Sequence, residues 1–129
     1  MAERINRTAS AQGKASRDKG KRFERDIANF FKNYGITARR TAQYCGKTGQ
    51  AGDVEGVPGV HIECKAVEKL NLEAAYQQSV RDAEAADKGE YPIVIHKKSR
   101  KPAMVTMALD DWIVMYLAWA RGDKEDDGQ

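Results

Sequence analysis

Hydrophobic residues recur at helical spacing in the first third of the chain. They form one stripe of five side chains, namely Phe23, Ile27, Phe30, Phe31 and Tyr34. This stripe predicts a helix that starts near Ser16 or Asp18 and runs to Tyr34, with Gly35 as its stop. On a helical projection Glu24 falls about 20° from Phe31. We therefore expect an acidic residue at the edge of the buried face.

Alternating polarity predicts the strands. In residues 60–66, Val60, Ile62 and Cys64 face one way, and His61, Glu63 and Lys65 face the other. Residues 52–65 read as two extended segments around a Pro-Gly turn, and residues 35–43 as a strand with Ile36 and Ala38 on one face. Residues 91–109 read as two strands around the basic turn KKSRKP.

Two further helices complete the predicted order. Asn71 can cap a helix over residues 72–88 that Gly89 closes, and Asp110 can cap a last helix. The apolar residues of the last helix are expected to be mostly core, and they are Trp112, Ile113, Met115, Tyr116, Leu117 and Trp119. The order helix, three strands, helix, two strands, helix predicts an α/β fold with a small mixed β-sheet flanked by helices.

Length and composition favour one intracellular domain. The chain has 129 residues, of which 41% are hydrophobic, and no apolar run approaches the length of a membrane span. No signal-peptide pattern opens the chain, so we expect a cytoplasmic protein that does not bind a membrane. Cys45 and Cys64 are expected to be reduced, with one disulfide as the alternative.

Charge divides the chain into three parts. We expect a mobile basic arm over residues 1–16, a domain over 17–121 and an acidic tail over 122–129. Residues 1–22 carry seven basic and two acidic residues, whereas residues 110–129 carry two basic and six acidic ones. A basic arm favours a polyanionic partner such as nucleic acid, and the alternative is a solvated disordered tail.

Asp53, Glu63 and Lys65 are the candidate residues of a catalytic metal site. A hairpin at the Pro-Gly turn would bring Asp53 near Glu63, and these carboxylates with the Cys64 carbonyl form a set of hard oxygen ligands for Mg²⁺ or Mn²⁺. Lys65 could orient a metal-bound water or stabilise charge on a phosphate, and Glu24 could complete the ligand set. The alternative is a solvated strand face with a weak surface pair.

These motifs resemble those of a nuclease superfamily. The segment GDV followed by IECK is similar to the PD-(D/E)xK signature, with Gly52 where that superfamily often has proline. Residues 16–100 more closely resemble the archaeal-type Holliday junction resolvases and their bacteriophage relatives, including the Lys-Gly-x-x-x-Glu segment that ends at Glu24. The resemblance implies a restriction-endonuclease-like core and a metal-dependent phosphodiesterase acting on DNA.

The same resemblance implies roles for particular residues. Glu24, Asp53 and Glu63 would be metal-binding acids and Lys65 the catalytic lysine. A glutamine of the following helix often joins such sites, and we favour Gln78 over Gln77. Whether Thr48 takes the place of a loop serine stays open. The expected DNA-binding residues are Arg17, Lys19, Lys21, Arg22, Arg39, Arg40, Lys47, Thr48, Lys97, Lys98, Arg100 and Lys101.

The sequence thus predicts a homodimeric, Mg²⁺-dependent endonuclease that resolves four-way DNA junctions. The same core with a repair or restriction target is one alternative. A DNA-binding module without catalysis is another, but pure binding does not require acids that repel phosphates.

Overall fold

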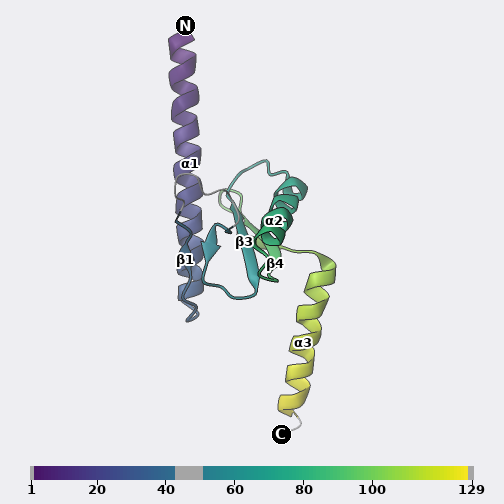
Figure 1. Cartoon of the computed structure of the whole chain (residues 1–129). Helices are drawn as coiled ribbons and strands as arrows, with labels where there is room; N and C mark the ends of the chain where they lie inside the picture. Colours follow the sequence, from purple (N-terminus) through teal and green to yellow (C-terminus); the bar gives the residue numbers. More distant parts are fainter. Residues whose placement is uncertain (1, 43–50, 128–129) are drawn as a thin grey trace.

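The computed structural model describes residues 2–42 and 51–127. Three helices and five strands follow one another as predicted (Figure 1). Their order is α1 (Ala2–Lys32), β1 (Arg39–Arg40), β2 (Val54–Glu55), β3 (Val60–Lys65), α2 (Leu72–Ala86), β4 (Tyr91–His96), β5 (Met104–Thr106) and α3 (Leu109–Asp127). The predicted α/β fold is confirmed.

The strands form one mixed sheet in the order β1-β2-β3-β4-β5. Only β3 and β4 run parallel, and the other neighbouring pairs are antiparallel. Parallel neighbours need a crossover connection, and α2 supplies it. The hairpin between β2 and β3 is therefore a local structure, whereas the pairing of β3 with β4 depends on the packing of α2.

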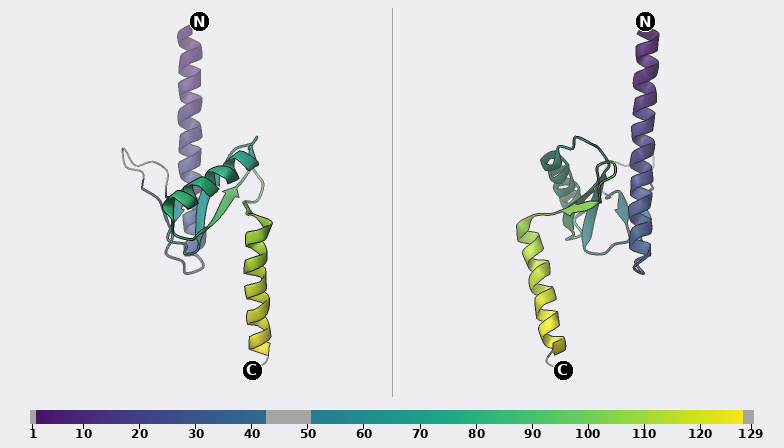
Figure 2. Two further views of the ribbon diagram at one scale, coloured as in Figure 1. Left: turned by 45° about the vertical axis from the view of Figure 1, so that its right-hand side comes forward. Right: turned by 180° about the vertical axis from the view of Figure 1, so that it is seen from behind.

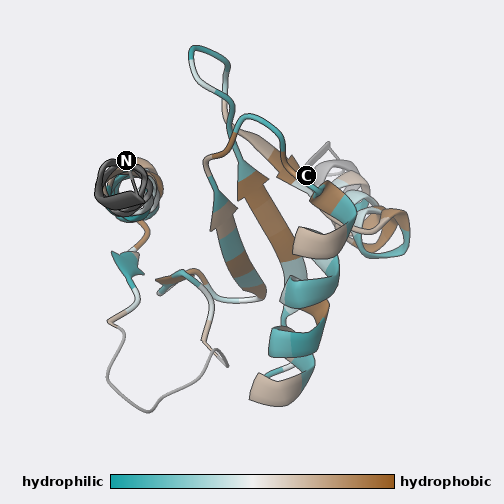
Figure 3. Cartoon of the chain, turned by 90° about the horizontal axis from the view of Figure 1, so that it is seen from above, coloured by the Kyte–Doolittle hydropathy of each residue, from teal (hydrophilic) through white to brown (hydrophobic). Residues whose placement is uncertain are grey.

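The two faces of the sheet are covered by different helices. The α1 face holds the main core, which consists of Phe23, Ile27, Ala28, Ala38, Val54, Ile62, Cys64, Ile93 and Ile95. The view from above in Figure 3 shows that hydrophobic residues dominate the central strands. On the other face Ser79 of α2 is fully buried, and its hydroxyl donates to the Ile93 carbonyl at 3.1 Å. Strand β3 is consequently enclosed on both sides.

Helix α1 begins far earlier than predicted. It starts at Ala2 rather than near Ser16, and its N-terminal part projects beyond the sheet (Figure 2). Residues 2–16 contain no proline and include several good helix formers, so a helix can continue there without an apolar stripe. The predicted start was therefore wrong, while the mobility of the arm stays a prediction.

Other boundaries differ by less. Strand β1 is limited to two residues, because the chain turns at Gly35, which has a φ of 80°, and bonds locally between Ala38 and Ile36. The Asn71 cap is confirmed, since its side-chain oxygen accepts the Ala74 N–H at 3.0 Å. Helix α2 ends at Ala86 with Asp87 in the left-handed conformation, two residues before the predicted end.

Helix α3 departs most from the prediction. It begins at Leu109, so Asp110 lies in its first turn and is not the cap. Its large apolar side chains are exposed rather than core, from 39% for Ile113 to 74% for Leu109. The helix points away from the sheet (Figure 2), whose two faces α1 and α2 already cover. Among the described residues, no helix is long and apolar enough to cross a membrane.

Candidate active site

The β2–β3 hairpin brings Asp53 against the strand that carries Glu63. The Asp53 backbone N–H donates to the Ile62 carbonyl at 2.7 Å. Its side-chain Oδ2 accepts the Cys64 N–H at 2.8 Å. These two bonds hold the carboxylate beside β3, which is the approach that the Pro-Gly turn predicts.

Glycine at position 52 makes this approach possible. A Cβ atom added to Gly52 would lie 2.6 Å from the Ile62 oxygen and 2.9 Å from the Ile62 nitrogen. Both atoms are backbone of the central strand and cannot move aside cheaply. The chain therefore needs glycine directly before Asp53, where the resembling signature often has proline.

Glu63 is buried beneath α2. Only 4% of its surface is exposed, and its Oε1 lies 3.3 Å from Nε2 of His61, which is also buried. Burial raises the pKa of Glu63 to about 7; the His61 contact opposes this rise, and nearby Asp53 adds to it. The polar face of β3 is thus an enclosed carboxylate site and not the solvated face of the alternative interpretation.

Glu24 reaches the same region from α1. Its Oε1 accepts a hydrogen bond from Arg40 Nε at 2.8 Å. Partial burial raises the pKa of Glu24, and the charge of Asp53 raises it further, while Arg40 opposes both effects. Arg40, expected to bind DNA, therefore holds a candidate ligand, and Arg39 similarly pairs with Glu55 at 2.6 Å.

Cys64 marks the centre of the group. Its thiol is free, and burial raises its pKa, as do the neighbouring charges of Asp53, Glu24 and Glu63. Lys65 acts in the opposite direction. Three carboxylates and one lysine thus lie near this strand position, although the ligand atoms of Glu24, Asp53 and Glu63 do not all come within 4.8 Å of one another. Carboxylate oxygens with a backbone carbonyl are the donor set that Mg²⁺ and Mn²⁺ prefer, so the residues fit such an ion.

Two residues near Glu63 were not assigned a role from the sequence. Ligand atoms of His61, Glu63 and Asp82 lie within 4.8 Å of one another, a set that could also hold a metal ion. Helical spacing is the sequence signal that could have found Asp82, because it follows the buried Ser79 by three positions on the inner side of α2. Gln78 is half-buried and Gln77 is exposed. The catalytic role of Gln78 stays a prediction.

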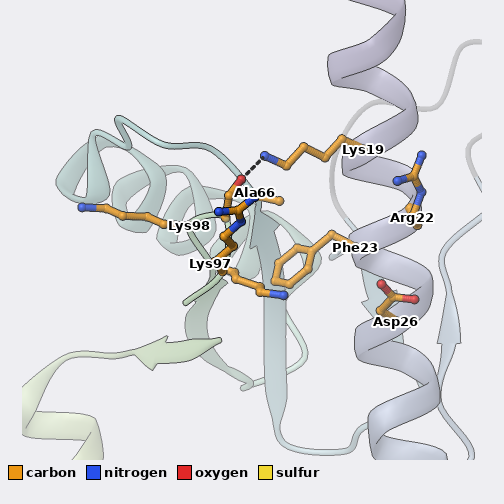
Figure 4. A pocket seen from close by; sticks show the side chains of 9 residues that line it. Lys19, Arg22, Phe23, Asp26, Ala66, Lys97 and Lys98 are labelled. Atoms are coloured by element: carbon orange, nitrogen blue, oxygen red, sulfur yellow. Dashed lines mark hydrogen bonds between the residues drawn. The ribbon is translucent and has the colours of Figure 1, made fainter. Parts of the chain in front are cut away.

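The expected DNA-binding residues fall into several groups. Lys47 and Thr48, like Cys45, lie outside the described residues. Arg17, Lys21 and Lys101 are exposed. Arg39 and Arg40 pair with the acids named above. The other five residues line one hollow between α1 and the β4–β5 turn, and they are Lys19, Arg22, Lys97, Lys98 and Arg100 (Figure 4). The sequence thus identified basic residues that the fold brings together from two distant segments.

Comparison with known proteins agrees with this fold. The chain is similar in structure to Hjc, a Holliday junction resolvase from the archaeal hyperthermophile Archaeoglobus fulgidus, with a TM-score of 0.52 and 23% identity. The similarity covers 68% of this chain and 76% of that one, and it supports the restriction-endonuclease-like fold. No curated protein matches the chain. The family model described as "Phage putative PDDEXK endonuclease" matches residues 15–122, and the chain therefore belongs to this endonuclease family.

Proposed function

We propose that this chain is a metal-dependent DNA endonuclease that resolves four-way junctions in the cytoplasm of a host cell. One observation carries the catalytic part of the proposal. Glu24 on α1, Asp53 directly before β2 and Glu63 on β3 all lie near Cys64, next to Lys65. Three carboxylates in one region repel one another and the phosphates of DNA, so their assembly requires a cation to be useful.

The residues divide the work of phosphodiester hydrolysis among them. Asp53, Glu63 and the Cys64 carbonyl would hold Mg²⁺, with Glu24 as a further ligand, and Mn²⁺ can substitute. A divalent ion in such a site lowers the pKa of bound water and neutralises charge on the phosphate. Lys65 stabilises the negative charge that develops on the phosphate oxygens. Arg40 keeps Glu24 in place through their 2.8 Å hydrogen bond.

Substitution of the acids tests the active site. Asp53→Asn, Glu63→Gln and Lys65→Ala should each abolish Mg²⁺-dependent cleavage of a synthetic four-way junction. The two acid variants should still bind the junction, because a negative charge near phosphate is removed. Glu84→Gln, at an exposed acid on α2, is the matched control and should cut normally. Full cleavage by Asp53→Asn or Glu63→Gln would refute the site.

The second part of the proposal is a homodimer formed through α3. Four apolar residues of α3 recur at intervals of three, four and three positions, and they are Leu109, Trp112, Tyr116 and Trp119. This is the spacing of a coiled-coil seam. The three aromatic rings lie against one another, with centroids 5.3 Å and 5.8 Å apart. A stripe with this spacing can bury its side chains against a second helix.

A second copy of α3 is the partner that fits this stripe. In an antiparallel pair, Arg121 of one copy would lie near Asp110 and Asp111 of the other. Trp112, Tyr116 and Trp119 are 44–62% exposed and Leu109 is 74% exposed, so this area is free to be buried. The flanking residues of the helix would have to supply the rest of the ~800 Å² that each partner buries in a typical stable interface. Two-fold symmetry would then supply the two opposed cuts that a four-way junction requires.

Oligomeric state and substrate choice test the dimer together. Wild type should sediment as a dimer, bind a junction more tightly than linear duplex and make paired nicks. Trp112→Ser with Trp119→Ser should give a monomer that nicks without pairing, whereas Met104→Ser, at an exposed apolar residue of β5, should stay dimeric. A monomeric wild type that cuts linear duplex equally would indicate a nuclease of the same core with another DNA target.

A further inference from the structure

A basic hollow lies beside the candidate active site. It has a volume of about 250 Å³ and opens between α1 and the turn that joins β4 to β5. Its charged lining consists of Lys19, Arg22, Lys97, Lys98 and Arg100, with Asp26 as the acidic member. Five positive charges against Asp26, with Glu68 beside Lys19, leave a net positive cavity that attracts an anion. We call it the basic pocket.

Several contacts join the two walls of the basic pocket. Lys19 of α1 donates to the Ser99 hydroxyl at 3.5 Å and lies 3.9 Å from Glu68. Glu68 also accepts the Ser99 backbone N–H at 2.9 Å, so it ties the turn to the segment after β3. Arg100 has a φ of 63°, a left-handed conformation that is costly without such support.

The inner charges come from both walls of the pocket. Lys19 reaches across from α1 to the turn, and Lys97 extends toward the ring of Phe23, whereas Lys98 extends away from α1 (Figure 4). Phe23 is 7% exposed and forms an apolar wall. Lysine ammonium groups above an apolar wall suit a phosphate group with its attached sugar, because the lysines contact the charged oxygens and the ring contacts carbon.

The pocket is joined directly to the candidate active site. Phe23 precedes Glu24 on α1, and Ala66 follows Lys65 at the end of β3. In addition, the Lys97 N–H donates to the Lys65 carbonyl at 3.0 Å. These neighbours place the pocket at the same end of β3 as Lys65. A strand whose cut phosphate lies at Lys65 would therefore pass the pocket within a few nucleotides.

We propose that the basic pocket binds one backbone phosphate of the cut strand, close to the phosphate that is hydrolysed, and so sets the register of the cut. This inference rests on the proposed nuclease function. Lys97 and Lys19 act as positioning residues, since they contact the DNA backbone away from the reacting atoms. No residue that lines the pocket is itself a ligand of the carboxylate site, so the pocket and the catalytic groups can be tested with separate substitutions.

Neutralising single phosphates tests the pocket. Junctions that carry one methylphosphonate, moved stepwise along each strand near the branch, would be titrated with wild type and with Lys97→Ala, and binding followed by fluorescence anisotropy. Wild type should lose about tenfold in affinity at one position. Lys97→Ala should bind the natural junction about as weakly as wild type binds the junction neutralised at that position. A methylphosphonate at that position should then weaken the binding of Lys97→Ala no further, while the effects at other positions stay as in wild type. The salt dependence of Lys97→Ala binding should also be shallower by about one counterion.

The controls separate this inference from the function on which it rests. Lys88→Ala removes an exposed lysine outside the pocket and should keep the wild-type profile. If Lys97→Ala keeps that profile while wild type cuts junctions, the pocket is refuted and the function stands. If wild type cuts no DNA, the function is refuted, and the binding scan still decides on the pocket because it needs no cleavage. A shifted cut position in Lys97→Ala would support the role in register.

Discussion

Replacing Glu63 by glutamine should stabilise the metal-free protein at neutral and alkaline pH. Glu63 is 4% exposed, and the pKa of its carboxyl rises from 4.5 to about 7 because burial disfavours the charged form. Glutamine has the same shape, keeps an acceptor for His61 and carries no charge. The variant therefore removes the cost of a buried carboxylate without opening a cavity.

The size of the effect follows from the two pKa values. A carboxyl whose pKa is raised by folding binds its proton more tightly in the folded state, so it stabilises the fold fully only below pH 4.5. As the pH rises through the folded pKa of about 7, that contribution is lost. Each pH unit between the two values is worth about 1.4 kcal/mol, which gives a loss on the order of 3 kcal/mol.

Urea unfolding in the presence of a chelator measures this loss. The free energies of unfolding of wild type and Glu63→Gln should differ little at about pH 4.5 and should diverge by roughly 3 kcal/mol at about pH 8, with the variant more stable. Glu84→Gln replaces an exposed acid on α2, and its free energy of unfolding should equal that of wild type at every pH. A constant difference between wild type and Glu63→Gln across this range would refute the reasoning.

Three further outcomes follow from contacts at the site. Gly52→Ala should destabilise the protein by about 1–3 kcal/mol in urea unfolding, because its Cβ would meet the Ile62 backbone. Gly20→Ala, with open space around its Cβ, should be neutral or stabilising by up to about 1 kcal/mol, and equal effects of the two would contradict the close approach. Arg40→Ala should leave Glu24 unpaired, cost about 1–2 kcal/mol and raise the Mg²⁺ concentration needed for half-maximal cleavage; an unchanged Mg²⁺ dependence would argue against Glu24 as a ligand. Chelation with EDTA should stop cleavage while junction binding persists, and Mg²⁺ or Mn²⁺ should restore it.

Local patterns were sufficient to predict much of the site. The alternation in residues 60–66, the Pro-Gly turn and the Asn71 cap each act over a few residues, and each appears in the structure where the pattern placed it. The hairpin then brings Asp53 to β3, since its two strands are adjacent in the sequence. The helical phase of Glu24 likewise predicted its position at the edge of the buried face.

Contacts between distant segments were not predictable in this way. Arg40 pairs with Glu24 across sixteen positions, and nothing in the local sequence distinguishes it from an arginine that binds DNA. The apolar residues of α3 carry the composition of a core helix, yet α1 and α2 already cover the sheet. Composition reports that such a helix needs an apolar partner, but it cannot say whether that partner lies in the same chain.

The placement of α1 on one face of the sheet also bears on how the protein opens. Strands β3 and β4, with α2 between them, form a contiguous unit over residues 60–96 that holds the longest ladder of the sheet. Glu24 is the one candidate acid that lies on α1, outside both this unit and the hairpin. Local openings of a protein cost less than global unfolding and follow such units. Detachment of α1 would take Glu24 out of the site, but it would also expose the main core that Phe23, Ile27 and Ala28 form with β3 and β4. Loss of activity and melting of the sheet should therefore occur together on warming.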